Sequence, residues 1–353
     1  MSSSVARGCE KNRKSSINFV NPLVCAPDPL YNKVDRIPTP LQGGHMKAPR
    51  ILVVGSISMD LIVTTGRFPE TGETVTGIGF STAPGGKGAN QAVQAARLGA
   101  DVTMVGRVGK DAFGKELLDS LSASGCVIDR IKEDSRHPTG VANVQIEQTA
   151  GSTNNRITVV PGANGALVPE DVDFLEVGIS DFDLVMLQFE VPMAVNLRTA
   201  EYAQKAGVPV LLNTAPAEAL PNELRNKITW LSANETETAV LTGILPSDNR
   251  STAAAVSALL DQGIEKVLLT LGARGAVLGS REGLLYAPCA PGVTVVDPTA
   301  AGDSFLGAFA YAVCSGMPSE DALHFANRAA GITVSRLGAQ PSLPTLTEIC
   351  ALP

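Results

Sequence analysis

The sequence is poor in cysteine, in positive charge and in long apolar runs. Its six cysteines lie far apart, without the close pairs of a zinc site or the density of a small disulfide scaffold. No apolar stretch approaches the roughly 20 residues that span a bilayer. We therefore expect reduced thiols in a cytoplasmic protein that has no membrane partner.

The formal net charge of −7 argues against a polyanionic partner. The chain has 28 Lys and Arg against 35 Asp and Glu, whereas nucleic acid requires a basic surface. The charge is uneven, because residues 1–50 carry eight Lys or Arg and three Asp or Glu, a net +5, which leaves −12 for the remainder. We expect no nucleic-acid partner.

Residues 1–48 have the composition of an extension. They are rich in serine and proline and have no sustained apolar period, so we predict a disordered extension, with a plastid or mitochondrial transit peptide as the alternative. Residues 49–353 then form one large domain. A hydrophobic content of 44% supplies enough apolar material for its core.

Short apolar runs alternate with helical patterns from Arg50 onward. Strands are predicted at 51–54, 101–109, 183–188, 208–215, 228–234 and 266–272. Helices are predicted at 87–98, 111–124, 192–206, 251–262, 302–315 and 319–336. This alternation predicts an α/β fold with a doubly wound, mostly parallel sheet that helices cover on both faces.

Four short segments rich in Val, Ile and Thr interrupt this order. They predict further strands at 60–65, 73–77, 141–148 and 156–162. We expect a small antiparallel sheet, from segments near 59–82 and 139–162, beside the carboxyl ends of the main strands. Ligands bind at those ends in open α/β folds, so the small sheet would act as a lid.

A glycine-rich loop, "APGGKGANQA" at residues 83–92, precedes a predicted helix, an arrangement that favours a bound anion. It is not a Walker motif, because Ser81 and Gly88 stand where that motif has Gly and then Ser or Thr. The first strand is followed by "GSISMD", which lacks the later glycines of a dinucleotide-binding fingerprint. A hydride-transfer enzyme is therefore disfavoured.

The segment "VVDPTAAGDSFLGAFAYA", residues 295–312, places small residues before an acidic one at a predicted helix start. The N–H groups of Ala300, Ala301 and Gly302 would point at one spot, with the Asp303 carboxylate beside them. Such a site combines an anion hole with a base. A helix cap is the alternative role for Asp303.

Together, "GGKGAN" and "DPTAAGDSF" resemble the two signature stretches of the pfkB carbohydrate kinase family, in the expected order and about 215 residues apart. The resemblance runs from about Arg50 to the end and includes "GETVTG", "NTAPAEALPNEL", "NETE" and "TLGARG". The lysine form of the first stretch is similar to that of the members that phosphorylate ribose. The resemblance implies transfer of phosphate from ATP to the 5-hydroxyl of D-ribose. Alternatives are a family kinase for deoxyribose, fructose or adenosine, and an inactive sugar-binding protein.

The resemblance implies a role for each matching residue. Asp303 would be the general base, and the amides of Ala300, Ala301 and Gly302 would hold the phosphoryl charge. The implied sugar contacts are Ser58, Asp60, Gly86, Lys87, Asn90, Glu190 and Asp303. Ser58 replaces an Asn that is usual in bacterial members, which bears on the strictness for ribose, and Pro298 replaces a Thr.

The resemblance also implies an ATP site, two cation sites and a homodimer joined through the lid. The implied ATP contacts are Asn234, Thr270, Gly272, Gly275, Gly302 and Asn327. Glu237 would organise water around Mg²⁺. The implied K⁺ ligands are the carbonyls of Thr299, Thr333, Arg336 and Gly338 and the side chains of Asp297 and Ser342. From the residues alone, "SANETETAV" is a helix N-terminus and "SRLGAQPS" a tight turn.

Overall fold

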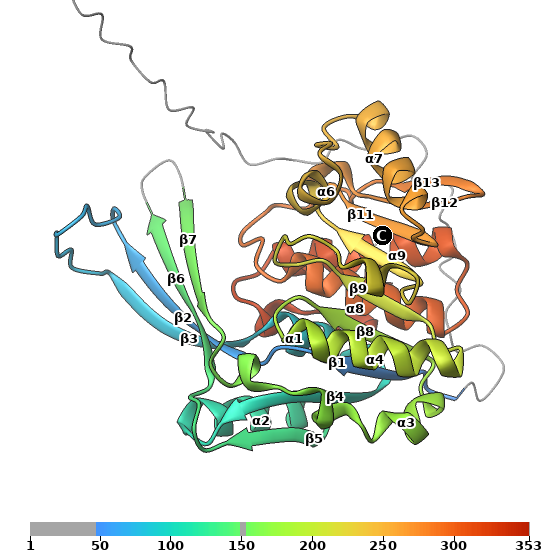
Figure 1. Ribbon diagram of the computed structural model, residues 1–353. Helices are drawn as coiled ribbons and strands as arrows, with labels where there is room; N and C mark the ends of the chain where they lie inside the picture. Colours follow the sequence, from blue (N-terminus) through green and yellow to red (C-terminus); the bar gives the residue numbers. More distant parts are fainter. Residues whose placement is uncertain (1–46, 149–152, 353) are drawn as a thin grey trace, which may run out of the picture.

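The computed structural model describes residues 47–148 and 153–352. The prediction for residues 1–48 therefore lies outside the described residues, apart from Lys47 and Ala48. Two sheets form the framework of the described part, one of nine strands and one of four (Figure 1). The α/β architecture and the separate small sheet confirm the predicted fold class.

The nine-stranded sheet has the order β13-β12-β11-β10-β9-β8-β1-β4-β5. Its strands are β1 (Arg50–Val54), β4 (Asp101–Gly109), β5 (Val127–Asp134), β8 (Leu184–Gln188), β9 (Val210–Asn213), β10 (Trp230–Ala233), β11 (Lys266–Thr270), β12 (Ala276–Ser280) and β13 (Gly283–Ala287). The pairs from β5 to β11 are parallel, and β12 and β13 add an antiparallel edge. The strand order reverses at β1, which places the ligand crevice at its carboxyl end.

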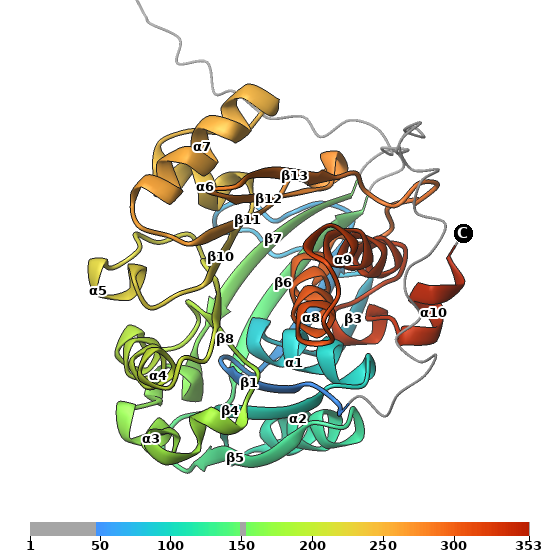
Figure 2. The same ribbon diagram turned by 90° about the vertical axis from the view of Figure 1, so that its right-hand side faces the viewer.

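Alternate residues of β1 separate two cores. Ile51 and Val53 pack in one core, Leu52 and Val54 in the other, and all four are fully buried. Figure 2 shows the two helical layers on opposite faces of the sheet. The first layer has α1 (Lys87–Arg97), α2 (Ala112–Ala123), α8 (Ala301–Cys314), α9 (Ser319–Val334) and α10 (Leu346–Ala351), and the second has α3 (Leu175–Gly178), α4 (Met193–Ala206), α5 (Asn222–Arg225), α6 (Glu235–Thr242) and α7 (Asn249–Asp261).

The small sheet projects from the main body on the side of the carboxyl ends of β1 and β4 (Figure 1). Its order is β3 (Gly79–Gly85), β2 (Ser58–Thr65), β6 (Gly140–Gln148) and β7 (Thr153–Val160). The outer pairs are antiparallel, as expected, whereas the inner pair of β2 with β6 is parallel. The two hairpins leave the main body separately and lie side by side in the same direction, and this produces the parallel pair.

One sequence prediction is wrong, and three strands of the main sheet were missed. Residues 73–77 are not a strand, because pairing along β2 begins only where the Ile78 N–H donates to the Thr64 carbonyl (2.8 Å), and β3 is the strand that follows. Strand β5 was missed, since its "VIDRIKED" sequence is a largely exposed edge with no apolar run. The hairpin of β12 and β13 was also missed.

The cysteines fit the expectation of reduced thiols only in part. Cys126, Cys314 and Cys350 are free, whereas Cys289 is disulfide-bonded, so the prediction is wrong for Cys289. Within residues 47–148 and 153–352, no helix has the length and apolar content required to cross a bilayer.

Candidate active site

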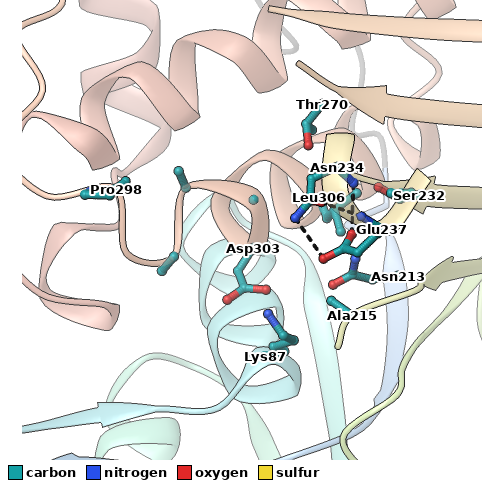
Figure 3. Close-up of a pocket in the computed structure, with 14 residues that line it drawn as sticks. Lys87, Asn213, Ala215, Ser232, Asn234, Glu237, Thr270, Pro298, Asp303 and Leu306 are labelled. Carbon is teal, nitrogen blue, oxygen red and sulfur yellow. Dashed lines mark hydrogen bonds between the residues drawn. The ribbon is translucent and has the colours of Figure 1, made fainter. Parts of the chain in front are cut away.

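A polar pocket lies where the carboxyl ends of β9, β10 and β11 face the N-terminus of α8 (Figure 3). It encloses about 190 Å³. Its lining residues come from five parts of the chain: Lys87, Asn213, Ala215, Ser232, Ala233, Asn234, Glu237, Thr270, Pro298, Ala300, Ala301, Gly302, Asp303 and Leu306. The glycine-rich loop and the start of α8, which the sequence separates by about 215 residues, thus meet at one site.

Asp303 occupies the first turn of α8 and is only 7% exposed. Two side-chain amides of α1 hold its carboxylate: Asn90 Nδ2 donates to Oδ2 (2.9 Å) and Gln91 Nε2 donates to Oδ1 (3.0 Å). Burial raises the pKa of Asp303, and the positive charge of Lys87 and these two hydrogen bonds act against that rise. The carboxylate is thereby oriented at the pocket wall without a direct salt bridge.

The helix start beside Asp303 has an unusual backbone. Ala300 caps α8 with φ 60°, the one positive φ at a non-glycine residue in the described part of the chain. An alanine in this conformation costs roughly 1 kcal/mol. The Ala301 N–H donates to the Pro298 carbonyl (3.2 Å), so a phosphoryl group at this turn would first meet the N–H groups of Ala300 and Gly302.

Lys87 is the cation of the site. Its amine points toward the Asp303 carboxylate in Figure 3. Burial opposes its charge, but the negative charges of Asp303, Glu190 and Glu237 outweigh that effect and raise the pKa of Lys87. Lys87 is therefore a positive charge held among the carboxylates of Asp303, Glu190 and Glu237.

The glycines of the loop pack against the chain's own backbone. A Cβ on Gly86, whose φ is 91°, would lie 2.8 Å from the Ser58 N and 2.9 Å from the Ser56 carbonyl oxygen. A Cβ on Gly88 would lie 2.7 Å from the Ser56 N. These glycines let the loop pack on the turn between β1 and β2. That contact is sufficient to require glycine at both positions, whether or not a ligand approaches them.

Glu190, after β8, binds the same turn and loop. Its Oε2 accepts hydrogen bonds from Ser56 Oγ (2.5 Å) and from the Lys87 N–H (3.1 Å). Asp60 lies in β2 against Gly85, and a Cβ there would be 2.7 Å from its carboxylate oxygens. Burial, and then the charges of Glu190, Asp303 and Asp297, raise the pKa of Asp60 to about 7.

Ser58 is buried and is held by a residue that sequence reasoning missed. Asn164 Nδ2 donates to Ser58 Oγ (3.0 Å) and to the Ile57 carbonyl (2.9 Å), while its Oδ1 accepts from the Ile57 N–H (2.9 Å). Asn164 follows the lid strand β7, so it ties the end of β7 that lies beside the main body to the start of β2, which carries Ser58 and Asp60. No local sequence pattern marks this long-range contact.

Asn234 and Glu237 form a reciprocal cap at the start of α6, as the sequence indicated. The Asn234 N–H and Nδ2 donate to the two Glu237 carboxylate oxygens (2.9 and 2.8 Å), and Asn234 Oδ1 accepts from the Glu237 N–H (2.9 Å) (Figure 3). Burial raises the pKa of Glu237. Both side chains also line the pocket.

The remaining residues predicted for ATP lie along β11 and α9. Thr270 ends β11 at the pocket wall, and Gly272 and Gly275 form the turn that follows. A Cβ on Gly275 would lie 2.1 Å from the Ala287 carbonyl oxygen. Asn327 Nδ2 donates to the carbonyls of Ala287 and of the next residue (both 2.9 Å), so it holds the loop after β13 in place.

The residues predicted for K⁺ come together beside the start of α8. The Asp297 carboxylate accepts from the N–H groups of Thr299 and Gly338 (both 2.9 Å). Ser342 Oγ donates to the Ala339 carbonyl (2.7 Å), and the Arg336 N–H donates to the Thr333 carbonyl (3.1 Å). The segment is thus a tight turn, as its composition indicated, and it is joined to the loop before α8.

Sequence reasoning missed the buried amides around Asp303. Gln91 and Gln188 are fully buried, and Asn213 is 7% exposed. Gln188 and Asn213 each end an apolar run at the carboxyl end of a strand, a position that could have marked them. Gln91 follows Asn90 directly and could have been noticed as a polar residue on the buried face of α1.

Comparisons with known proteins identify the family of this chain. Residues 48–346 match the model of the pfkB family of carbohydrate kinases. A ribokinase of Haemophilus influenzae is 40% identical over 84% of this chain and 96% of its own length, and one of Schizosaccharomyces pombe is 41% identical over 85% and 96%. The structure of Arabidopsis thaliana ribokinase complexed with ribose and ATP has a TM-score of 0.79 and 36% identity, over 87% of this chain and 99% of that one. This chain therefore belongs to the pfkB family of carbohydrate kinases.

Proposed function

We propose that the protein transfers the γ-phosphoryl group of ATP to the 5-hydroxyl of D-ribose. The observation that carries the proposal is the buried Asp303 carboxylate, oriented by Asn90 and Gln91 in the first turn of α8 and faced by Lys87. This arrangement supplies a base and a phosphate-binding turn within one pocket. Relatives that are about 40% identical and are named ribokinases support the choice of ribose.

Asp303 acts as the general base in the proposed reaction. The sugar hydroxyl donates to the carboxylate, which takes the proton as the hydroxyl oxygen bonds to the γ-phosphorus and the bond to the β-phosphate oxygen breaks. The hydrogen bonds from α1 leave the remaining lone pairs of the carboxylate for this task. Burial raises its pKa and so strengthens it as a proton acceptor.

The start of α8 and Lys87 stabilise the phosphoryl group during transfer. Ala300, Ala301 and Gly302 line the pocket. The N–H groups of Ala300 and Gly302 would bind the group, with that of Ala301 available if its turn bond to Pro298 opens. Charge on the transferring group is the main barrier in phosphoryl transfer, so fixed N–H dipoles and one ammonium suit the chemistry.

The sugar site lies on the other side of Lys87. We assign its hydrogen bonds to Asp60, Glu190 and Asn90, with Ser58 and the Gly86 loop at its floor. Support comes from the Glu190 carboxylate, which joins the loop to the turn after β1. The lid strands β2 and β6 would then cover the sugar.

The ATP side takes Asn234, Thr270, Gly272, Gly275 and Asn327 as its proposed contacts. Mg²⁺, when bound with the nucleotide, neutralises phosphate charge. Both Glu237 oxygens already accept from Asn234, which suits a role through water more than direct ligation. Among the described residues, no group of three or more His, Cys, Asp or Glu side chains could enclose a metal, so the phosphates and water would supply most of the Mg²⁺ shell.

A K⁺ site is proposed at the loop that precedes α8. Carbonyls of Thr299, Thr333, Arg336 and Gly338, with the Asp297 and Ser342 side chains, form an all-oxygen donor set of the kind that hard cations prefer. The two loops already meet through Asp297. A cation there would fix the backbone up to Ala300.

The remaining proposals concern the whole chain. We propose that residues 49–353 are one kinase domain and that two copies join through the lid, where Ile78, Phe80 and Ile157 are more than half exposed. The cytoplasmic location stays a prediction, with a plastid or mitochondrion as the alternative.

A substrate panel tests the proposed function. ADP release is measured with ATP, Mg²⁺ and K⁺ for ribose, deoxyribose, fructose and adenosine. We expect kcat/KM to be highest for ribose. A higher value for another acceptor would make the protein a family kinase of that specificity, and ribose binding without ADP release would make it a sugar-binding protein.

A further inference from the structure

Two buried glutamine side chains from different elements form a hydrogen-bonded chain that ends on Asp303. Gln91 lies in α1 and Gln188 at the carboxyl end of β8, and both are fully buried. Gln91 Nε2 donates to Asp303 Oδ1 (3.0 Å), and Gln188 Nε2 donates to Gln91 Oε1 (2.8 Å). The chain links the centre of the main sheet to the first turn of α8.

The carboxylate sets the direction of both amides. An ionised carboxylate only accepts hydrogen bonds, so Gln91 must present its NH₂ group to Asp303 and its oxygen to Gln188. Gln188 must then turn its own NH₂ group toward Gln91. Its Oε1 is left at the end of the chain, where it is buried and has no hydrogen-bond partner among the described residues. An unsatisfied buried acceptor lowers stability. The two hydrogen-bonded glutamines are therefore better explained by their effect on Asp303 than by a contribution to stability.

The surroundings hold this arrangement in place. A Cβ on Gly55 would lie 1.9 Å from Gln188 Oε1, so a glycine provides the space for that oxygen. Asn196 Nδ2 donates to the Gln188 carbonyl (2.7 Å), and Asn213 Oδ1 lies 3.3 Å from Gln91 Nε2 as a second acceptor. If Gln91 alone turned its amide over, its oxygen would face the acceptors of Asp303 and Asn213, and its NH₂ group would face the NH₂ donor of Gln188.

We propose that Gln91, held by Gln188, is a positioning residue that fixes the plane of the Asp303 carboxylate and directs its free lone pair at the acceptor hydroxyl. The proposal rests on the proposed function in naming that hydroxyl. Asn90 holds the other carboxylate oxygen. The charged groups that face Asp303 are Lys87 on α1, Glu190 after β8, Asp60 on β2 and Glu237 on α6, and they stay unchanged in the variants below.

Steady-state kinetics of two variants test the two hydrogen bonds, from Gln91 to Asp303 and from Gln188 to Gln91, one at a time. Gln91→Met keeps the length of the side chain and removes the donor, so kcat should fall about tenfold or more while KM for ribose and ATP stays within about twofold. Gln188→Met leaves the donor in place without its support and should lower kcat less. Gln94→Met is the matched control, because Gln94 is a buried glutamine of α1 that binds Ser304 and Pro344 instead of Asp303.

The pH profile separates positioning from a general structural loss. A hydrogen bond to a carboxylate favours its ionised form, so Gln91→Met should raise the pKa of Asp303 and move the acidic limb of kcat/KM upward by about one pH unit. Gln188→Met should move it less, and Gln94→Met should leave it in place. A wild-type kcat, or a loss of activity that is equal at every pH, would overturn the proposal.

A readout without turnover keeps this test independent of the proposed function. The Asp303 carboxyl can be titrated by ¹³C NMR in protein labelled at aspartate and assigned with Asp303→Asn. It should titrate at higher pH in Gln91→Met than in the wild type, even if ribose is not the substrate. Equal titration would overturn the positioning role. If Gln91→Met does not fold, the same titration of Asp303 in Gln188→Met tests the proposal.

Discussion

The Asp297 carboxylate accepts a hydrogen bond from the backbone N–H of Gly338, 41 residues further along the chain (2.9 Å). Its other oxygen binds the Thr299 N–H, one residue before the helix cap Ala300. A change at the C-terminal turn can therefore reach the proposed phosphate-binding turn through a single carboxylate.

If the two loops connected by Asp297 bind K⁺, initial rates in a potassium-free buffer should rise more on addition of KCl than of NaCl. Asp297→Asn and Ser342→Ala should reduce that activation, by roughly tenfold for the aspartate, which carries the charge. Ser335→Ala is the matched control, because within the described part of the chain Ser335 Oγ binds only the Ile332 carbonyl. Equal rates in KCl, in NaCl and without either salt would exclude the cation site.

Asp303→Asn should lower kcat by about 10² to 10⁴-fold, since a general base contributes that much, and should leave ribose affinity within a few-fold. Calorimetry gives the affinity and a coupled ADP assay gives kcat. Asp321→Asn is the control, because Asp321 also lies in the first turn of a helix but does not line the pocket. If both variants lose the same small amount of activity, Asp303 only stabilises its helix.

The close contact of Gly86 with the chain's own backbone predicts the effect of a substitution there. Gly86→Ala places a Cβ against the backbone of Ser56 and Ser58 at a φ of 91°, so it should displace the loop and weaken ribose binding by about tenfold or more while ATP binding persists. Gly99→Ala also has a positive φ but nothing within 4 Å of its Cβ, and it should lose only stability. Loss of ATP binding with intact ribose binding would contradict the assignment.

The raised pKa of Asp60 predicts that its replacement stabilises the protein but weakens ribose binding. Its pKa is about 7 in the folded protein and 3.8 ordinarily, so the folded state binds more protons between these values and loses stability as pH rises through that range. Asp60→Asn should raise Tm by roughly 5 °C at pH 8 and less at pH 5. It should also weaken ribose binding at pH 8. A Tm difference that does not change with pH would contradict this account.

The exposed apolar residues of the lid predict a dimer. Phe80 is 69% exposed, and Phe80→Glu should shift a sedimenting dimer to monomer at micromolar concentration by placing charge in the contact. Val177→Glu, at a residue that is 88% exposed in α3, should leave the dimer intact. A wild-type protein that sediments as a monomer would remove the proposal.

Most of the main sheet could be predicted because its strands are buried on both faces and appear as apolar runs. Strand β1 is an example, with four fully buried residues in succession. The edge strand β5 and the lid strand β3 lack that signal, since their side chains are largely exposed and their positions depend on pairing with β4 and β2.

The site residues divide in the same way into those that local sequence could place and those that it could not. Asp303 and Lys87 lie in local motifs that name a chemistry, so sequence could place them. Gln188 and Asn164 act through contacts with segments about a hundred residues away, and neither belongs to a local pattern. The contact of the loop glycines with the chain's own backbone could not be predicted either, because such a contact leaves no mark beyond the glycine itself.

The parallel pairing of β2 with β6 has a consequence for the order of folding. Ser58 pairs with Gly140, and the chain between them returns to the main body to form α1, β4, α2 and β5. An isolated two-stranded hairpin is marginally stable in water. We therefore expect the lid to form only after this intervening part of the main sheet has folded, so hydrogen exchange during refolding should protect β4 before β2 and β6.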